Sequence, residues 1–285
     1  MAYWIVLIVF AVLAGAVYIA VARYGMYLYL TRQKSSLRGV VIWEDLGEVP
    51  MASSMYTPQG MTWVNGRILF ANSWKNTRSR VYEFDPETMT SLRHFDMPEG
   101  AVHTSGLAWD GVDLWAVDFI SNDAYCLDLE ASLASGEAQV KDLFTTTLKG
   151  TSACCFVPWH GETRLAISDF MHSRRTILVR YQDALARGTA DCCIEFEYLN
   201  EGFSQGLEFA EGFLYESENK AGNDVINRID LELLQKTGNA RKATVRQLNA
   251  PNGGVEDLAW DGQYMWTSDE QVFRFFRSQL DSTGE

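Results

Sequence analysis

Ser105-Gly106-Leu107-Ala108-Trp109-Asp110-Gly111 is the clearest copy of a motif that recurs along this chain of 285 residues. It is a short apolar run that ends in an Asp-Gly turn, and a second apolar run, Leu114-Trp115-Ala116, follows the turn. Asp-Gly between two apolar runs is the strongest short-range signal of a β-hairpin. The stretch therefore predicts two paired strands, and its recurrence predicts a repeat architecture.

Four further copies of the hairpin follow a regular spacing. Their first strands are Gln59-Gly60-Met61-Thr62-Trp63, Ser152-Ala153-Cys154-Cys155-Phe156, Gln205-Gly206-Leu207-Glu208-Phe209 and Glu256-Asp257-Leu258-Ala259-Trp260. Third strands are visible at 80–85 and 225–230, and fourth strands at 94–95, 140–144, 194–198 and 245–248. The copies recur every 46 to 53 residues, which is close to the spacing of four-stranded propeller blades.

The two ends of the repeat region predict how the ring closes. The fifth copy stops after its third strand, 271–275, and an extra strand, 40–46, precedes the first copy. If the extra strand completes the last blade, no sheet edge is left without a partner. The sequence therefore predicts an all-β five-bladed propeller over 40–280, closed by an N-terminal strand and followed by a short tail, 281–285.

Residues 1–22 differ from the rest because they contain no charged side chain. About 20 apolar residues span a hydrocarbon layer of roughly 30 Å, so we expect one transmembrane helix that anchors a single-pass membrane protein. Residues 23–39 form a basic juxtamembrane linker in this interpretation. A cleaved signal peptide is the alternative, since Ala14-Gly15-Ala16 resembles a cleavage site, although a basic n-region is missing.

Charge and cysteine content bear on partners and location. The formal net charge is −13, with four basic residues and no acidic one before Gly39, and −17 for the remainder. So acidic a domain is a poor candidate for binding nucleic acid. The basic flank and the odd number of cysteines, two pairs of them adjacent in sequence, favour a cytoplasmic propeller. A membrane, a membrane protein, and a peptide or small-molecule ligand are the expected partners.

In a propeller the first residue of each motif copy, just before the glycine, faces the central channel. These residues are Gln59, Ser105, Ser152, Gln205 and Glu256. A single carboxyl group among neutral polar side chains is suited to general acid–base catalysis, because burial without a cationic partner raises its pKa toward neutrality. The alternative is a channel that polar side chains and water simply fill. His103 lies near the same end of its blade.

A second set of oxygen-bearing residues ends the second strands: Asn72, Asp118, Asp169, Glu218 and Asp269. Five such residues at one repeat position suit a hard cation such as Ca²⁺, whereas strand-end Asp residues commonly cap turns. We expect turn caps, with calcium as the alternative. Trp63, Trp109 and Trp260 share another repeat position, and we expect them to pack between blades.

Phe203-Ser204-Gln205-Gly206-Leu207, followed by Leu214-Tyr215-Glu216-Ser217, resembles the F-x-Q-G-L…LYES stretch of plant-type and bacterial glutaminyl cyclases. Those proteins are five-bladed propellers that need no metal, and a Glu on the next inner strand shuttles protons. The resemblance assigns that role to Glu256 and a substrate-binding role to Phe203 and Gln205. We expect Gln59, at the same repeat position as Gln205, and Trp74 and Lys75 to bind substrate as well. Trp74-Lys75 resembles the W-K of another blade of that family, and those proteins are exported.

The implied reaction is cyclisation of a peptide's N-terminal glutamine to pyroglutamate with release of ammonia. The motif copies also resemble gluconolactonase and strictosidine synthase-like propellers, which imply a metal-dependent lactonase as one alternative. A non-catalytic scaffold that binds a membrane partner or a small ligand is the other alternative. The sequence leaves the three open.

Overall fold

The computed structural model of the protein describes residues 38–49, 56–219 and 224–280. The expected membrane anchor, 1–22, nearly all of the linker 23–39 and the tail 281–285 lie outside these ranges. Within them, no helix combines the length and the apolar character that crossing a bilayer requires.

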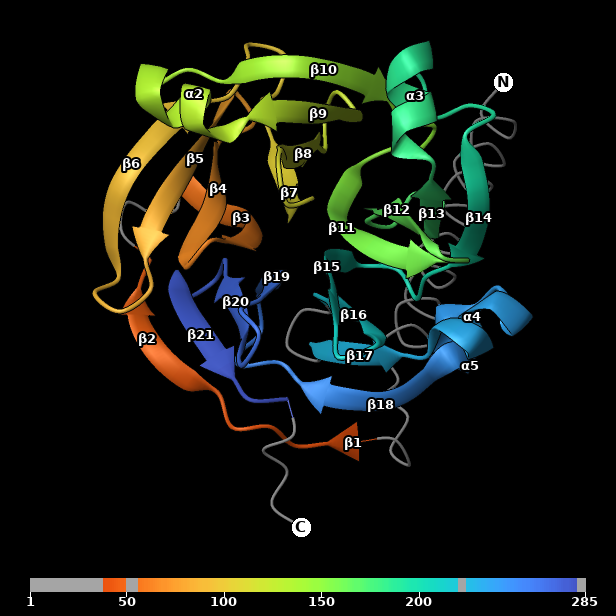
Figure 1. Ribbon diagram of the computed structural model, residues 1–285. Helices are drawn as coiled ribbons and strands as arrows, with labels where there is room; N and C mark the ends of the chain where they lie inside the picture. Colours follow the sequence, from red (N-terminus) through yellow and green to blue (C-terminus); the bar gives the residue numbers. More distant parts are fainter. Residues whose placement is uncertain (1–37, 50–55, 220–223, 281–285) are drawn as a thin grey trace, which may run out of the picture. The chain divides into compact units, whose positions relative to one another are not determined.

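Five sheets stand around a central axis, one for each copy of the motif (Figure 1). Blade 1 consists of β3 (Tyr56–Val64), β4 (Arg67–Trp74), β5 (Arg78–Asp85) and β6 (Thr90–Asp96). Blade 2 consists of β7 (Thr104–Trp109), β8 (Leu114–Asp118), β9 (Asp123–Asp128) and β10 (Gln139–Thr145). Blade 3 consists of β11 (Thr151–Trp159), β12 (Glu162–Asp169), β13 (Arg175–Val179) and β14 (Ile194–Leu199).

Blade 4 consists of β15 (Ser204–Ala210), β16 (Phe213–Glu218), β17 (Val225–Ile229) and β18 (Thr244–Asn249). Blade 5 consists of β19 (Val255–Trp260), β20 (Met265–Asp269), β21 (Arg274–Ser278) and β2 (Glu44–Glu48). The predicted five-bladed propeller is therefore confirmed. The first strand of each blade lies innermost, so β3, β7, β11, β15 and β19 surround the axis (Figure 1).

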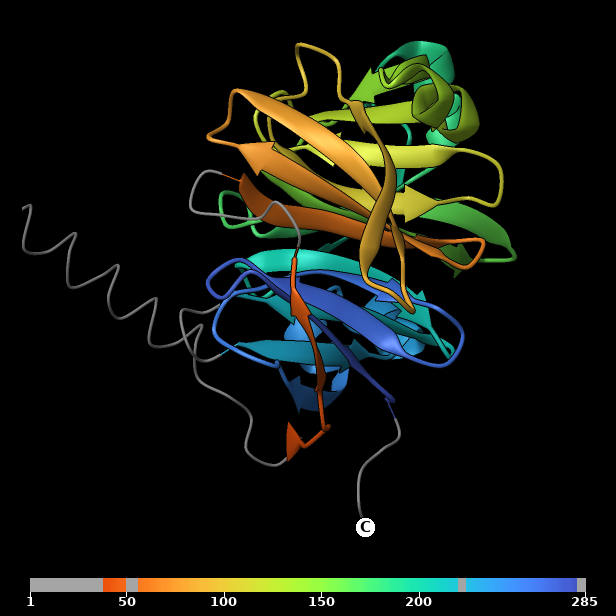
Figure 2. The same cartoon turned by 90° about the vertical axis from the view of Figure 1, so that its left-hand side faces the viewer.

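The N-terminal strand closes the ring, as predicted. β2 pairs antiparallel with β21, and the side view shows the two strands together (Figure 2). The chain enters through a short strand, β1 (Arg38–Gly39), which extends blade 4 by pairing with β18 in parallel. The entering chain therefore joins two blades: β1 pairs with β18 of blade 4, and β2 pairs with β21 of blade 5.

Two of the predicted strands of blade 5 begin later than expected. The closing strand begins at Glu44 and not at 40, because the chain before it is held by Asn249: the Val41 backbone N–H donates to Asn249 Oδ1 over 2.8 Å. The third strand begins at Arg274 and not at 271. The Asp269 carboxylate accepts the backbone N–H groups of residues 271 and 272 and so holds that stretch as a turn.

Short helices connect the third and fourth strands of three blades at the outer rim (Figure 1). They are α2 (Leu129–Ser135), α3 (Tyr181–Arg187), and the pair α4 (Leu231–Thr237) and α5 (Ala240–Ala243). Asp128 and Asp230 cap α2 and α4 by accepting a backbone N–H of the first turn. The helices lengthen blades 2, 3 and 4 without reaching the axis.

Large aromatic side chains pack between blades, as predicted for Trp63, whereas Trp109 and Trp260 line a cavity at the end of the inner strands. Trp63 of blade 1 stacks on Trp266 of blade 5, with 6.0 Å between ring centroids. Asp261 of the Asp-Gly turn holds Trp266 in place by accepting its indole N–H over 2.7 Å. Asp110 and Trp115 repeat this bond in blade 2 over 2.9 Å. The motif's Asp thus fixes the turn and orients a core side chain.

Candidate functional site

The glycine of the motif lies where neighbouring inner strands approach one another most closely. A Cβ placed on Gly60 would lie 2.8 Å from the backbone of Gly106, and one on Gly106 would lie 2.7 Å from the backbone of Ala153. A Cβ on Gly206 would lie 2.6 Å from the Cα of Asp257. Because such distances leave no room for a side chain, this position sets how tightly the blades surround the axis.

A β-bulge lies at the same place in every inner strand. The register shifts between Pro58 and Met61, Thr104 and Gly106, Thr151 and Ala153, Ser204 and Gly206, and Val255 and Leu258. The skipped positions include all five polar residues that the sequence analysis assigned to the channel. A β-bulge re-aims a side chain away from the regular alternation of a strand. The side chains of these five residues therefore do not alternate with their neighbours in the same sheet.

Only two of the five polar residues contact each other. Gln205 Nε2 donates to Glu256 Oε1 over 3.2 Å, which joins blades 4 and 5. Gln59 Oε1 instead lies 2.8 Å from His103 Nε2. Ser105 donates to the backbone oxygen of Thr151 over 2.6 Å. These two bonds join blade 1 to blade 2 and blade 2 to blade 3, so they stabilise the packing of the blades around the axis.

Ser152 also turns away from the Gln205–Glu256 pair. Its hydroxyl lies 3.1 Å from the hydroxyl of Ser168 in the same blade. The predicted polar ring is thus reduced to one interacting pair, Gln205 and Glu256, with the remaining members engaged in bonds that stabilise the propeller.

Glu256 is fully buried and carries a strongly perturbed acidity. Its exposed fraction is 0%. Its Oε2 makes no hydrogen bond of regular geometry to a described residue. Burial raises the pKa of Glu256 well above its ordinary value, and the charges of neighbouring acidic side chains, Glu270 foremost, raise it further, whereas the nearby Asn219 side chain acts to lower it. The side chain therefore holds a proton more tightly than an exposed carboxyl group does, as expected of a general acid.

Asp257 occupies the axis directly beside Glu256. Its Oδ2 accepts the backbone N–H groups of Met61 over 2.8 Å and Leu107 over 3.2 Å. Its Oδ1 accepts those of Leu207 over 3.3 Å and Leu258 over 2.9 Å. Four blades thus donate to one fully buried carboxyl group. This role was not predicted from the sequence, although the replacement of glycine by aspartate at the motif's second position is a sign of it.

An arc of aromatic rings lies at the same end of the propeller as Glu256. Phe203, which precedes β15, packs edge-on against Phe170 with 5.6 Å between ring centroids. Phe170 contacts Phe119 at 6.4 Å, and Phe119 contacts His103 at 5.2 Å. Phe119 and Phe170 were not singled out from the sequence. Each directly follows the oxygen-bearing residue at the end of a second strand, so extending the repeat alignment by one position would have found them.

The same repeat position supplies two polar neighbours of Glu256. Asn219 follows Glu218 at the end of β16, and Glu270 follows Asp269 at the end of β20. Asn219 Nδ2 donates to Glu270 Oε1 over 3.0 Å. Burial raises the pKa of Glu270, and the bond from Asn219 partly opposes that shift.

Trp74 and Lys75 lie at the end of β4 and in the turn after it. The Arg78 guanidinium stacks over the Trp74 ring, 4.6 Å from its centroid. Lys75 is exposed and has a positive φ of 49°. Their expected part in substrate binding stays a prediction.

Three of the strand-end carboxylates, those of Asp118, Asp169 and Asp269, act as turn caps. Asp118 accepts the backbone N–H groups of His103 over 2.6 Å and of Ile120 and Ser121 over 2.9 Å each. Asp169 accepts from Ser173. Among the described residues, no group of three or more His, Cys, Asp or Glu side chains is placed to hold a metal ion. The alternative assignment of these positions to calcium therefore gains no geometric support.

Comparison with known proteins supports the fold. No protein-family model matches the chain, and no curated protein matches it in sequence. Among solved structures, the glutaminyl cyclase of Myxococcus xanthus matches with a TM-score of 0.60 and 14% sequence identity. The match covers 85% of this chain and 97% of that one. The resemblance expected from the Phe203–Ser217 stretch is thus confirmed at the level of the fold, a five-bladed propeller of the kind that glutaminyl cyclase has.

Proposed function

We propose that the protein cyclises N-terminal glutamine residues of peptides, with Glu256 as the group that transfers the proton. The observation that carries this proposal is the environment of Glu256. It is a fully buried carboxyl group at the propeller axis, with a raised pKa, one oxygen bonded to Gln205 and the other without a hydrogen bond of regular geometry to a described residue. The fold shared with a glutaminyl cyclase supports the proposal.

The reaction requires one proton to move between two nitrogen atoms. The neutral α-amine attacks the carbon of its own side-chain amide, a C–N bond forms, and a five-membered ring closes. The bond from that carbon to its NH₂ group breaks, and ammonia leaves. In its ionised form, Glu256 accepts on Oε2 the proton that the attacking amine loses and returns this proton to the departing nitrogen, so the carboxylate ends as it began. The raised pKa of Glu256 does not prevent this transfer.

Positioning supplies the rest of the catalysis. Gln205 fixes Glu256 through the 3.2 Å bond, so Oε2 is the atom left for the substrate. Phe203 and Phe170 form an edge-on aromatic pair against which the apolar part of the glutamine side chain packs. Holding the amine and the amide in the geometry of attack removes part of the entropic cost of the reaction.

The test is turnover of a peptide that begins with glutamine. Mass spectrometry measures the loss of ammonia from the peptide, and an ammonia assay measures its release into solution. The Glu256→Gln variant keeps the shape of the side chain but cannot carry the proton, so we expect kcat to fall at least about 100-fold. Glu211→Gln, which changes an exposed carboxyl group in the turn after β15, is the matched control and should retain full activity. Equal turnover by the Glu256→Gln variant and the wild type would refute the role of Glu256.

A non-catalytic scaffold is the second candidate, and Asp257 is the observation that favours it. Its four bonds close the channel directly beside Glu256, as in a propeller whose axis serves only to hold the blades. Absence of turnover with every glutamine-initiated peptide tried would leave this candidate, with a membrane protein or a small ligand as the partner.

We also propose that residues 1–22 hold the propeller at a membrane. The uncharged apolar run followed by Arg23, Arg32, Lys34 and Arg38 supports this, since basic residues flank the cytoplasmic end of most membrane anchors.

A further inference from the structure

A cavity lies at the end of the inner strands opposite Glu256. Glu256 is the second residue of β19, whereas the cavity is lined by the last residues of the inner strands, among them Trp109 and Trp260. Its volume is about 250 Å³. The bonds of Asp257 to four blades stand between the two ends, so the cavity is separate from the site proposed for glutamine cyclisation.

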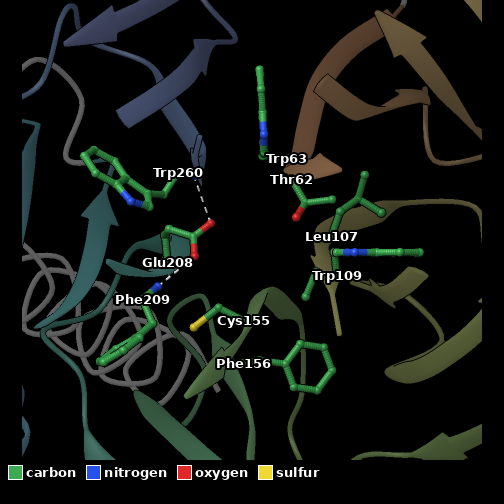
Figure 3. A pocket seen from close by; sticks show the side chains of 10 residues that line it. Thr62, Trp63, Leu107, Trp109, Cys155, Phe156, Glu208, Phe209 and Trp260 are labelled. Atoms are coloured by element: carbon green, nitrogen blue, oxygen red, sulfur yellow. Dashed lines mark hydrogen bonds between the residues drawn. The ribbon is translucent and has the colours of Figure 1, made fainter. Parts of the chain in front are cut away.

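The lining of this cavity combines one carboxyl group with apolar walls. The ten lining residues are Thr62, Trp63, Leu107, Ala108, Trp109, Cys155, Phe156, Glu208, Phe209 and Trp260. Figure 3 shows the Glu208 carboxyl group inside a circle of aromatic side chains, with the Thr62 hydroxyl directed toward the interior. All five blades contribute, and none of the ten residues is basic.

Glu208 is held in place by the backbone alone. Its Oε1 accepts the N–H of Phe209 over 2.9 Å, and its Oε2 accepts the N–H of Trp260 over 3.2 Å. Among the described residues, it forms no ion pair. Burial raises the pKa of Glu208 to about 8, while the two backbone bonds act in the opposite direction. A carboxyl group so placed lacks a positive partner, and a ligand can supply one.

We propose that this cavity binds a small organic ammonium ion, whose N–H groups donate to Glu208 and Thr62 while its apolar body lies against the aromatic walls. The lining offers no basic side chain to an anion, and an ionised Glu208 would repel one. A hard metal ion needs several oxygen ligands, and the lining offers only the side-chain oxygens of Glu208 and Thr62. A cavity of 150 Å³ holds a benzene ring, so a ligand of about ten non-hydrogen atoms fits here.

Binding of a cation is coupled to the release of a proton from Glu208. The titratable groups that interact with Glu208 are Cys154 and Cys155 on β11 and Asp257 on β19, and burial raises the pKa of each well above its ordinary value. None of them supplies a positive charge. Because the ligand favours the ionised carboxylate, affinity rises with pH up to about 8 and falls only where the ammonium ion itself loses its proton, near pH 10.

The test uses 2-phenylethylammonium as the probe and the full-length protein. We expect saturable binding by calorimetry and by the fluorescence of the cavity tryptophans. At pH 7, calorimetry in buffers of different ionisation enthalpy should show release of about one proton for each ligand bound. The uncharged isostere 2-phenylethanol should bind at least about 10-fold more weakly and release no proton, because it forms no ion pair with Glu208.

Variants locate the ligand. Glu208→Gln should weaken binding at least about 10-fold and abolish proton release, and Thr62→Val, which removes only the hydroxyl, should weaken it about 5-fold. Glu211→Gln on the same hairpin should change neither. Equal binding of the alcohol, no saturation up to about 10 mM, or loss of binding in Glu256→Gln with none in Glu208→Gln would each overturn the proposal.

Discussion

Asp257 illustrates how one residue can serve a whole ring. Glycine, or alanine in one blade, occupies the motif's second position elsewhere, and the backbone N–H of the next residue points to the axis in four blades. Those donors are removed from water by the close approach of the strands and need an acceptor. Burial raises the pKa of Asp257, and the backbone N–H donors oppose that shift by stabilising the carboxylate.

Replacing Asp257 by Asn should therefore cost stability. Asn keeps the shape but exchanges one acceptor oxygen for an NH₂ group that faces N–H donors, so we expect the free energy of unfolding to fall by about 2–4 kcal/mol. Urea denaturation monitored by tryptophan fluorescence measures the change. Asp191→Asn, at an exposed position, is the control and should stay within about 0.5 kcal/mol of the wild type. An Asp257→Asn variant as stable as the wild type would show that water satisfies the donors equally well.

At the scale of single elements, the inner strands were the most predictable part of the molecule. The bulge recurs in all five inner strands, and in blades 1, 2 and 4 a glycine accompanies it, which allows the neighbouring strand to approach closely while the preceding side chain is redirected. Gln205 and Glu256 could be assigned to the axis for this reason. Their contact depends on the positions of two adjacent blades, and the same positions in blades 2 and 3 hold serines that bond elsewhere.

The glycine of this element should not tolerate a methyl group. Gly106→Ala would place its Cβ 2.7 Å from the Ala153 Cα, and the backbone of two strands would have to move apart. We expect a loss of about 3 kcal/mol or more in the free energy of unfolding. Gly100→Ala is the matched control, because its Cβ would meet only the Tyr125 hydroxyl at 3.7 Å. Thermal or urea denaturation of the two variants decides, and equal stability would contradict the packing described for the axis.

At the scale of the whole molecule, the entering chain completes the ring. β2 supplies the fourth strand of blade 5, and Val41 and Val49 on either side of it are 3% and 2% exposed. Ion pairs of Arg274 with Asp45 over 2.8 Å and of Arg277 with Glu44 over 2.7 Å add little, because both are near the surface. Without this strand, β21 would present an unpaired edge to solvent.

Two truncated chains distinguish membrane anchoring by residues 1–22 from closure of the propeller by β1 and β2. A chain that begins at Ser35 retains β1 and β2, and we expect it to leave the membrane fraction and to unfold in one cooperative transition. A chain that begins at Met51 lacks both strands, and we expect it to lose that transition and to aggregate. Cell fractionation and urea denaturation are the measurements. Recovery of the Ser35 chain in the membrane fraction would contradict the role given to residues 1–22.

The sequence by itself determined the number of blades and the strand that closes them, and it placed Gln205 and Glu256 among five polar residues expected at the axis. Only the structure showed that these two meet. The blades and their closure follow from local patterns, because a turn and an alternating apolar run specify a hairpin wherever they occur. The tertiary structure alone decided that Asp257 bonds to four blades, that Gln59 bonds to His103, and that Glu208 lies in a cavity at the far end. These contacts join residues far apart in the chain, and small differences in backbone position decide which donor reaches which acceptor.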